Sequence, residues 1–131
     1  MKIFFEHTES SKRNKLGGIM MRETRELPKN EWRRFFDAIS SGLPGKAVDI
    51  TLITPQERVH QSCVWQLHGV TYDPHDDALI ISCRQQEHVI ASPLEIRIDR
   101  DAFRINSIEV IKGPGDLELV RFVEPLLLPV A

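Results

Sequence analysis

Apolar side chains recur at helical spacing in one segment near the N-terminal end of the chain. The positions that form this face are Trp32, Phe35, Phe36 and Ile39, at i, i+3, i+4 and i+7. Pro28 suits a first helical turn, and Gly42 followed by Pro44 favours termination. The pattern therefore predicts one helix over about residues 28–41. Its aromatic face should pack against the rest of the protein.

Beyond Gly45 the apolar period changes from 3.6 to two residues, which is typical of β-strands. Alternation is clear in residues 48–53 and 94–99, and residues 117–123 form the last of about six short strands that follow one another closely. In residues 65–72 the apolar phase changes at His68-Gly69, so we expect a β-bulge at Gly69.

The order of these segments predicts an α+β fold. No second helix separates the strands, so antiparallel pairs are expected. We expect one N-terminal helix (about 28–41) packed on a mostly antiparallel, strongly bent sheet or small open barrel of about six strands. Residues 21–123 should form a single domain. Residues 1–20 are expected to be a disordered leader, and residues 124–131 an apolar C-terminal tail.

Composition agrees with an ordinary globular domain. The chain has 131 residues, of which 41% are hydrophobic and 27% charged, so disordered and collagen-like classes are excluded. No apolar run approaches the ~20 residues of a membrane helix, and the N-terminus lacks the apolar stretch of a secretory signal. A cytoplasmic location with no membrane partner is expected. Translation from Met20 or Met21 is a further hypothesis, which peptides from residues 1–19 would reject.

Charge is divided unevenly along the chain. The net charge is −2, but residues 1–34 carry a balance of +4 and residues 35–131 a balance of −6. A nucleic-acid-binding small barrel is therefore one alternative function. Its basic residues would be Lys12, Arg13, Lys15, Arg22, Arg25, Arg33 and Arg34. The acidic body argues against nucleic acid as the partner.

The chain contains two cysteines, Cys63 and Cys83, each in a strand-like segment. Neither belongs to a C-x-x-C pair, so zinc and thioredoxin-type sites are not favoured. Two reduced, buried thiols are the simplest interpretation, and a disulfide requires that the two strands be neighbours.

Several short motifs occur together in one order along the chain. They are Leu27-Pro28, Glu31-Trp32, Phe35-Phe36, Leu67-x-Gly69-Val70-Thr71-Tyr72-Asp73, His88-Val89-Ile90, Pro93 and Val120-Arg121-Phe122. In these motifs the chain resembles the bacterial family called domain of unknown function 5335, over about residues 24–123. The resemblance implies a small cytoplasmic α+β domain and supplies no catalytic residues.

The candidate chemistry gathers around three histidines and an aspartate. His68, Asp73, His75 and His88 would make a small metal-dependent or acid–base site if the fold brought them together. However, Asp73-Pro74-His75-Asp76-Asp77 is also typical of a hairpin turn, and it lacks the Gly and distal Glu of a calcium loop. No H-E-x-x-H, G-x-S-x-G or P-loop motif is present. We therefore expect no catalytic residue, metal or cofactor.

The C-terminal segment gives the one indication of a partner. Leu126, Leu127 and Leu128 lie between Pro125 and Pro129, and three leucines left in water would form an exposed apolar patch. They should either fold back on their own domain, which we favour, or dock on another copy. A homodimer through a barrel edge or through this tail would follow from docking. The leading interpretation is a small non-enzymatic binding or assembly domain of unknown partner.

Overall fold

The computed structural model describes residues 22–60 and 64–128. The predicted leader 1–20 and Cys63 lie outside the described residues. In chain order the elements are β1 (Glu23–Leu27), the 3-10 turn η2 (Lys29–Glu31), α2 (Trp32–Ile39), the 3-10 turn η3 (Ser40–Gly42), β2 (Ala47–Ile53), β3 (Arg58–His60), β4 (Trp65–Asp73), β5 (Ala78–Cys83), β6 (Glu87–Ala91), β7 (Glu95–Arg100), β8 (Arg104–Gly113) and β9 (Asp116–Leu127).

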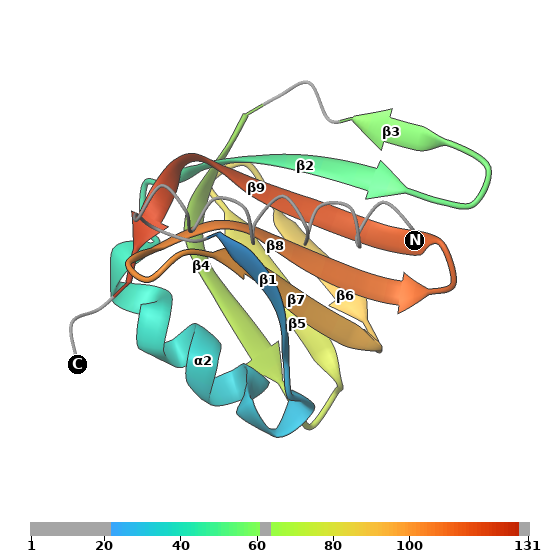
Figure 1. Ribbon diagram of the computed structural model, residues 1–131, viewed down its shortest axis with the longest axis horizontal. Coiled ribbons are helices and arrows are strands. Elements are labelled where there is room, and N and C mark those ends of the chain that lie inside the picture. Colours follow the sequence, from blue (N-terminus) through green and yellow to red (C-terminus); the bar gives the residue numbers. More distant parts are fainter. Residues whose placement is uncertain (1–21, 61–63, 129–131) are drawn as a thin grey trace.

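All strand pairs are antiparallel, and the strands form one sheet that folds over on itself (Figure 1). Its order is β1-β7-β8-β9-β2-β4-β5-β6, with β3 paired to β2 outside this path. Strand β4 pairs with β2 only at Ala47 and Val48, and then leaves to form a second layer with β5 and β6. The predicted α+β class and the antiparallel, bent sheet are confirmed.

One detail of the prediction is wrong, since the path of the sheet contains eight strands rather than about six. Of the two predicted forms, the bent sheet is the one observed, because the sheet is not closed into a barrel. Strand β1 was missed because charged side chains occupy most of Glu23–Leu27 and hide any alternation. Pairing with β7, rather than burial of one face, accounts for this strand. Strand β3 lies in the polar segment after Pro55, where no apolar alternation is present, and it pairs with the end of β2.

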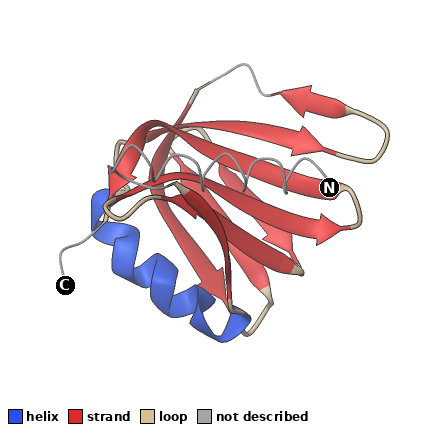
Figure 2. Cartoon of the chain, in the orientation of Figure 1, coloured by secondary structure: helices blue, strands red, loops and turns tan. Residues whose placement is uncertain are grey.

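Helix α2 lies across one end of the folded sheet (Figure 2). Trp32, Phe36 and Ile39 are buried, which confirms the apolar face. The Trp32 indole Nε1 donates to the Leu27 carbonyl at 2.8 Å, and the Trp32 ring meets Tyr72 edge-on at 5.0 Å. These contacts attach the helix to β1 on one side and to β4 on the other.

The core fills the space between the two layers and beneath the helix. Its side chains beyond the helix include Leu43, Val48, Leu67, Val70, Leu79, Ile81, Ile90, Ile96, Ile105, Val110 and Val120. The bulge predicted at Gly69 is present, since the β4–β5 register shifts between Leu67 and Gly69. The extra residue, His68, lets both Leu67 and Val70 point into the core, where regular alternation would expose one of them.

Candidate functional site

The outer face of the larger layer, turned away from the core, carries two rows of mostly polar side chains that cross several strands. Cross-strand pairing places them in register, because paired residues point to the same face. The first row is Thr24, Asp99, Ser107, Arg121 and Asp49, and the second is Glu26, Arg97, Glu109, Leu119 and Thr51. An antiparallel sheet with one wet face has this arrangement.

A register shift between β8 and β9 makes part of β9 protrude beside these rows. Ile105 pairs with Leu126, but Ser107 pairs with Arg121, so four residues of β9, 122–125, stand opposite the single residue Asn106 of β8. Phe122 still pairs with Val48 of β2, so the excursion lies in residues 123–125. Pro125 has no N–H to give to a ladder, which suits a position in this excursion. The result is a groove on the outer face rather than a flat surface.

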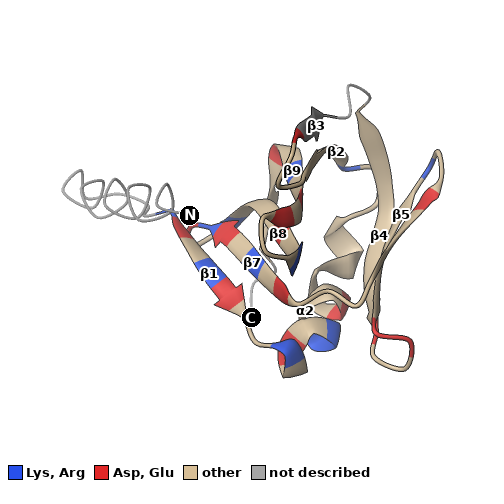
Figure 3. Ribbon diagram, turned by 90° about the vertical axis from the view of Figure 1, so that its right-hand side faces the viewer, with Lys and Arg blue, Asp and Glu red and all other residues tan. Residues whose placement is uncertain are grey.

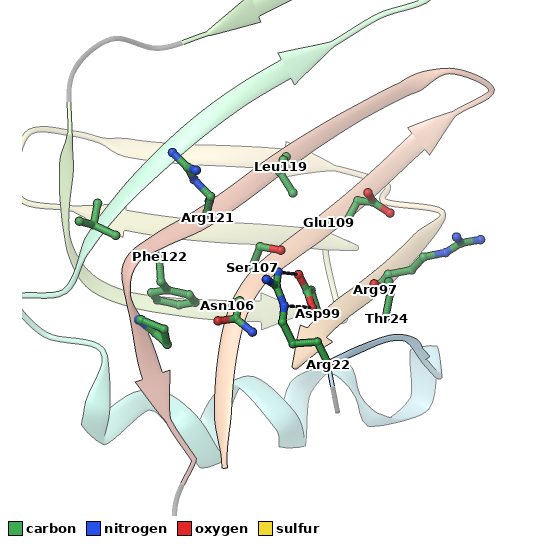
Figure 4. Close-up of a pocket in the computed structure, with 12 residues that line it drawn as sticks. Arg22, Thr24, Arg97, Asp99, Asn106, Ser107, Glu109, Leu119, Arg121 and Phe122 are labelled. Carbon is green, nitrogen blue, oxygen red and sulfur yellow. Dashed lines mark hydrogen bonds and ion pairs between the residues drawn. The ribbon is translucent and has the colours of Figure 1, made fainter. Parts of the chain in front are cut away.

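The groove has a volume of about 530 Å³ (Figure 4). Four strands contribute its lining, together with the β9 excursion. The lining residues are Arg22, Thr24, Arg97, Asp99, Asn106, Ser107, Glu109, Leu119, Arg121, Phe122, Val123 and Pro125. This volume lies in the range of small-molecule sites, ~300–1,000 Å³.

In each of two ion pairs in this region, the arginine side chain is exposed to solvent and the carboxylate is mostly covered. Arg22 pairs with Asp99 at 2.5 Å, and their side chains are 52% and 14% exposed. Arg121 pairs with Asp49 at 2.8 Å, with 63% and 13% exposed. Figure 4 shows the Arg22 guanidinium beside Asp99, with Ser107 and Asn106 close to them. The groove therefore presents guanidinium groups to a ligand while the paired carboxylates are mostly covered.

Two polar atoms of the groove are buried without a hydrogen-bond partner in the described part of the chain. They are the amide Nδ2 of Asn106, a donor, and the carboxyl Oε1 of Glu109. Burial raises the pKa of Glu109, and the charges of Glu95 and Asp99 add to this effect against the opposing charge of Arg97. An unpaired buried polar atom costs about 1–3 kcal/mol. Both atoms are closed to water, so a ligand reaches them only if groove side chains move.

A second polar group lies between the two layers. His88 Nε2 of β6 and Glu118 Oε1 of β9 are 2.5 Å apart, and Lys112 Nζ of β8 donates to Glu118 Oε2 at 3.0 Å. The hydrogen bond to Glu118 raises the pKa of His88. Burial raises the pKa of Glu118, but the hydrogen bonds and charges of His88 and Lys112 outweigh it and leave the pKa lowered. This network holds β6 against the larger layer.

The predicted cluster is divided among different parts of the sheet. Asp73 and His75 share the β4–β5 turn, where Asp73 Oδ1 accepts from the His75 N–H at 2.9 Å, and the His75 side chain is 92% exposed. This turn is the acidic loop that joins β4 and β5 in Figure 3. His68 is exposed at the bulge, and His88 contacts Glu118. Within the described residues, neither makes a hydrogen bond or ion pair with the turn, and no group of three or more His, Cys, Asp or Glu could hold a metal ion.

The three C-terminal leucines have three different environments. Leu126 pairs with Ile105 and is buried at 2% exposure in its own chain. Leu128 packs partly buried against the core, while Leu127 is 69% exposed near Phe103. Docking of this segment on another copy stays a prediction, and it now depends on Leu127.

Comparison with known proteins gives a family match over residues 23–131, described as "Family of unknown function (DUF5335)". The chain belongs to this family. The match extends beyond the resemblance over 24–123 and includes the C-terminal segment. An uncharacterized protein of Aquifex aeolicus (strain VF5) is 32% identical over 111 residues, which cover 81% of this chain and 97% of the relative. No solved structure matches the chain.

Several motif residues of this DUF5335 chain make contacts that hold the helix and the β4–β5 turn in place. Trp32 binds the Leu27 carbonyl, Tyr72 donates to Asp77 Oδ1 at 2.5 Å, and Asp73 caps its turn. Burial, followed by the bond to Asp77, raises the pKa of Tyr72 to about 12, so this hydroxyl stays protonated as a donor. These motif residues therefore stabilise the fold.

Sequence reasoning missed the groove because its lining is spread from Arg22 to Pro125. The sequence shows which positions of a strand are polar, as at Arg97 and Asp99. It does not show which strands are neighbours in the sheet. Over residues 22–60 and 64–128, the structure holds no helix with the length and apolar character needed to cross a membrane.

Proposed function

We propose that the protein is a small non-enzymatic binding domain whose outer groove holds a small organic anion. The observation that carries the proposal is the unequal exposure of the two ion pairs that flank Ser107. Arg22 and Arg121 are more than half exposed, while Asp99 and Asp49 are mostly covered. A guanidinium has five N–H donors, so each arginine can bind a carboxylate or phosphate group of a ligand in addition to its own partner.

Other groups near these arginines also suit an anion. Ser107 lines the groove with a hydroxyl, and the Asn106 amide is a buried donor without a partner among the described residues, which a ligand reaches once groove side chains move. Leu119, Val123 and Pro125 give the groove an apolar part, which suits an organic ligand.

The nucleic-acid alternative rests on Arg22, Arg25, Arg33 and Arg34 among the described residues. The net charge of −2 argues against a nucleic-acid polyanion as the ligand, and Arg25 and Arg33 pair with Glu23 and Asp37 outside the groove. Lys12, Arg13 and Lys15 lie outside the described residues.

A cytoplasmic location is part of the proposal. Cys83 is a buried, free thiol, which suits a reducing compartment.

The experiment is a thermal-shift titration with succinate, phosphate and the uncharged analogue succinamide. Succinate or phosphate should raise the Tm of the wild-type chain and of the control Arg33→Gln, which lies on α2 outside the groove. Succinamide should have no effect. The double variant Arg22→Gln, Arg121→Gln should lose the shift, measured against its own ligand-free Tm.

The two anions distinguish a carboxylate ligand from a phosphate ligand. Equal shifts in the wild type and the double variant, or no shift with either anion, would contradict the proposal. Tighter, steeply salt-dependent binding of a single-stranded oligonucleotide would favour the nucleic-acid alternative instead.

A further inference from the structure

Strand β6 ends the smaller layer and has an unpaired edge. It pairs with β5 from Ala78↔Ala91 to Ser82↔Glu87, and no other strand of the described chain pairs with it. An exposed strand edge offers main-chain N–H and C=O groups to another strand.

Flanking hydrogen bonds show which residues of β6 direct these groups outward. The Cys83 N–H donates to the Gln86 carbonyl at 2.9 Å, and the Ser92 N–H donates to the Asp77 carbonyl at 2.7 Å. Hydrogen-bonded and non-hydrogen-bonded pairs alternate along an antiparallel ladder. His88 and Ile90 therefore bond to β5, and the residues with outward main-chain groups are Glu87, Val89 and Ala91.

This edge is complementary to itself. When a second β6 lies antiparallel and is centred on Val89, Val89 faces its own copy and Glu87 faces Ala91. No like charges oppose one another, and each facing pair can exchange two main-chain hydrogen bonds. Neither lysine nor proline interrupts Glu87–Ala91, although these residues commonly protect natural edges.

An exposed apolar side chain lies at the centre of the same edge. Val89 is 52% exposed and pairs with the partly buried Ile80 of β5. In the two-fold arrangement, four side chains form one apolar row across the interface, in the order Ile80 and Val89 of one copy, then Val89 and Ile80 of the other. The dimer thereby covers a valine that the single chain leaves in water.

The other end of the sheet does not suit such pairing. Strand β1 reads Glu-Thr-Arg-Glu-Leu and is charged at three of its five positions. Centring two copies on Arg25 would place arginine against arginine. Charged side chains of this kind protect an edge strand.

We propose that a second copy of this chain pairs antiparallel with β6, through Glu87, Val89 and Ala91, to form a two-fold dimer with one continuous sheet. The bond from His88 to Glu118 fixes β6 from the inner side, so the edge is preorganised. The dimer is independent of the anion groove, which lies on the outer face of the other layer.

The test is size-exclusion chromatography with light scattering of the full chain, whose mass is 15.1 kDa. The wild type should have twice this mass, and Val89→Lys should have the single-chain mass with an unchanged circular dichroism spectrum. Phe103→Lys is the matched control, because Phe103 is equally apolar and 64% exposed but lies near Leu127. It should remain a dimer.

A monomeric wild type would overturn the proposal, as would a dimeric Val89→Lys variant. If Phe103→Lys alone gave a monomer, the interface would be the C-terminal segment. Hydrogen exchange gives a second measurement. The amides of Val89 and Ala91 should be protected in the wild type and should exchange quickly in Val89→Lys.

Discussion

At the scale of single residues, Asp101 and Glu118, the two buried acidic residues of the described chain, each have specific partners. Asp101 is 4% exposed, and its Oδ1 accepts from the backbone N–H groups of Phe103 and Arg104, both at 2.9 Å. Glu118 is equally buried and binds His88 and Lys112. Buried charges are costly unless they are paired, so these contacts decide where the acids can lie.

The pair of His88 and Glu118 makes stability depend on pH. The pKa of His88 is raised above 6.5 in the folded state, so its contribution is fully present below pH 6.5 and is lost as the pH rises through the folded pKa. Glu118 has a lowered pKa in the folded state, so its contribution to stability is present above pH 4.5 and is lost only as the pH falls into the acidic range. His88→Gln should therefore cost about 1.5–3 kcal/mol below pH 6.5 and less in alkaline buffer.

Urea denaturation across this pH range measures the effect. His75→Gln is the control, because His75 is 92% exposed, and it should change the unfolding free energy by less than about 0.5 kcal/mol at every pH. A cost for His88→Gln that stays constant with pH would show that the charge of His88 does not contribute.

At the scale of elements, two glycines differ in whether their backbone conformation requires glycine. Gly115 in the β8–β9 turn has φ +69°, and a Cβ there would lie 3.4 Å from Pro55 Cγ. Gly69 at the bulge needs no such φ, and a Cβ would meet nothing within 4 Å. Gly115→Ala should destabilise the protein by about 1–2 kcal/mol, whereas Gly69→Ala should be neutral or slightly stabilising. Thermal unfolding of the two variants checks this difference, and equal effects would contradict it.

The elements were predictable wherever burial imposes a period. Trp32, Phe36 and Ile39 revealed the helix, and the phase change at His68-Gly69 revealed the bulge. Strand β1 shows no apolar period, because pairing with β7 stabilises it and its side chains are mostly exposed. The excursion at residues 123–125 was likewise hidden, since Pro125 alone does not show where a ladder opens.

At the scale of the whole molecule, the fold separates an apolar interior from a polar outer groove. Ser107 and Arg121 are neighbours only because β8 and β9 pair, and Asp99 joins them only through β7. Strand order is a long-range property that the local pattern does not contain. The sequence therefore predicted the core and the fold class, but it contained no local sign of the groove.

The most direct test of the central claim is an NMR titration of the ¹⁵N-labelled chain with succinate and with phosphate. The account predicts that the amide shifts concentrate at Asp99, Asn106, Ser107 and Arg121, while α2 and the β4–β5 turn remain unchanged. Shifts confined to α2 or to the turn from Asp73 to Asp77, or an absence of shifts with both anions, would contradict it.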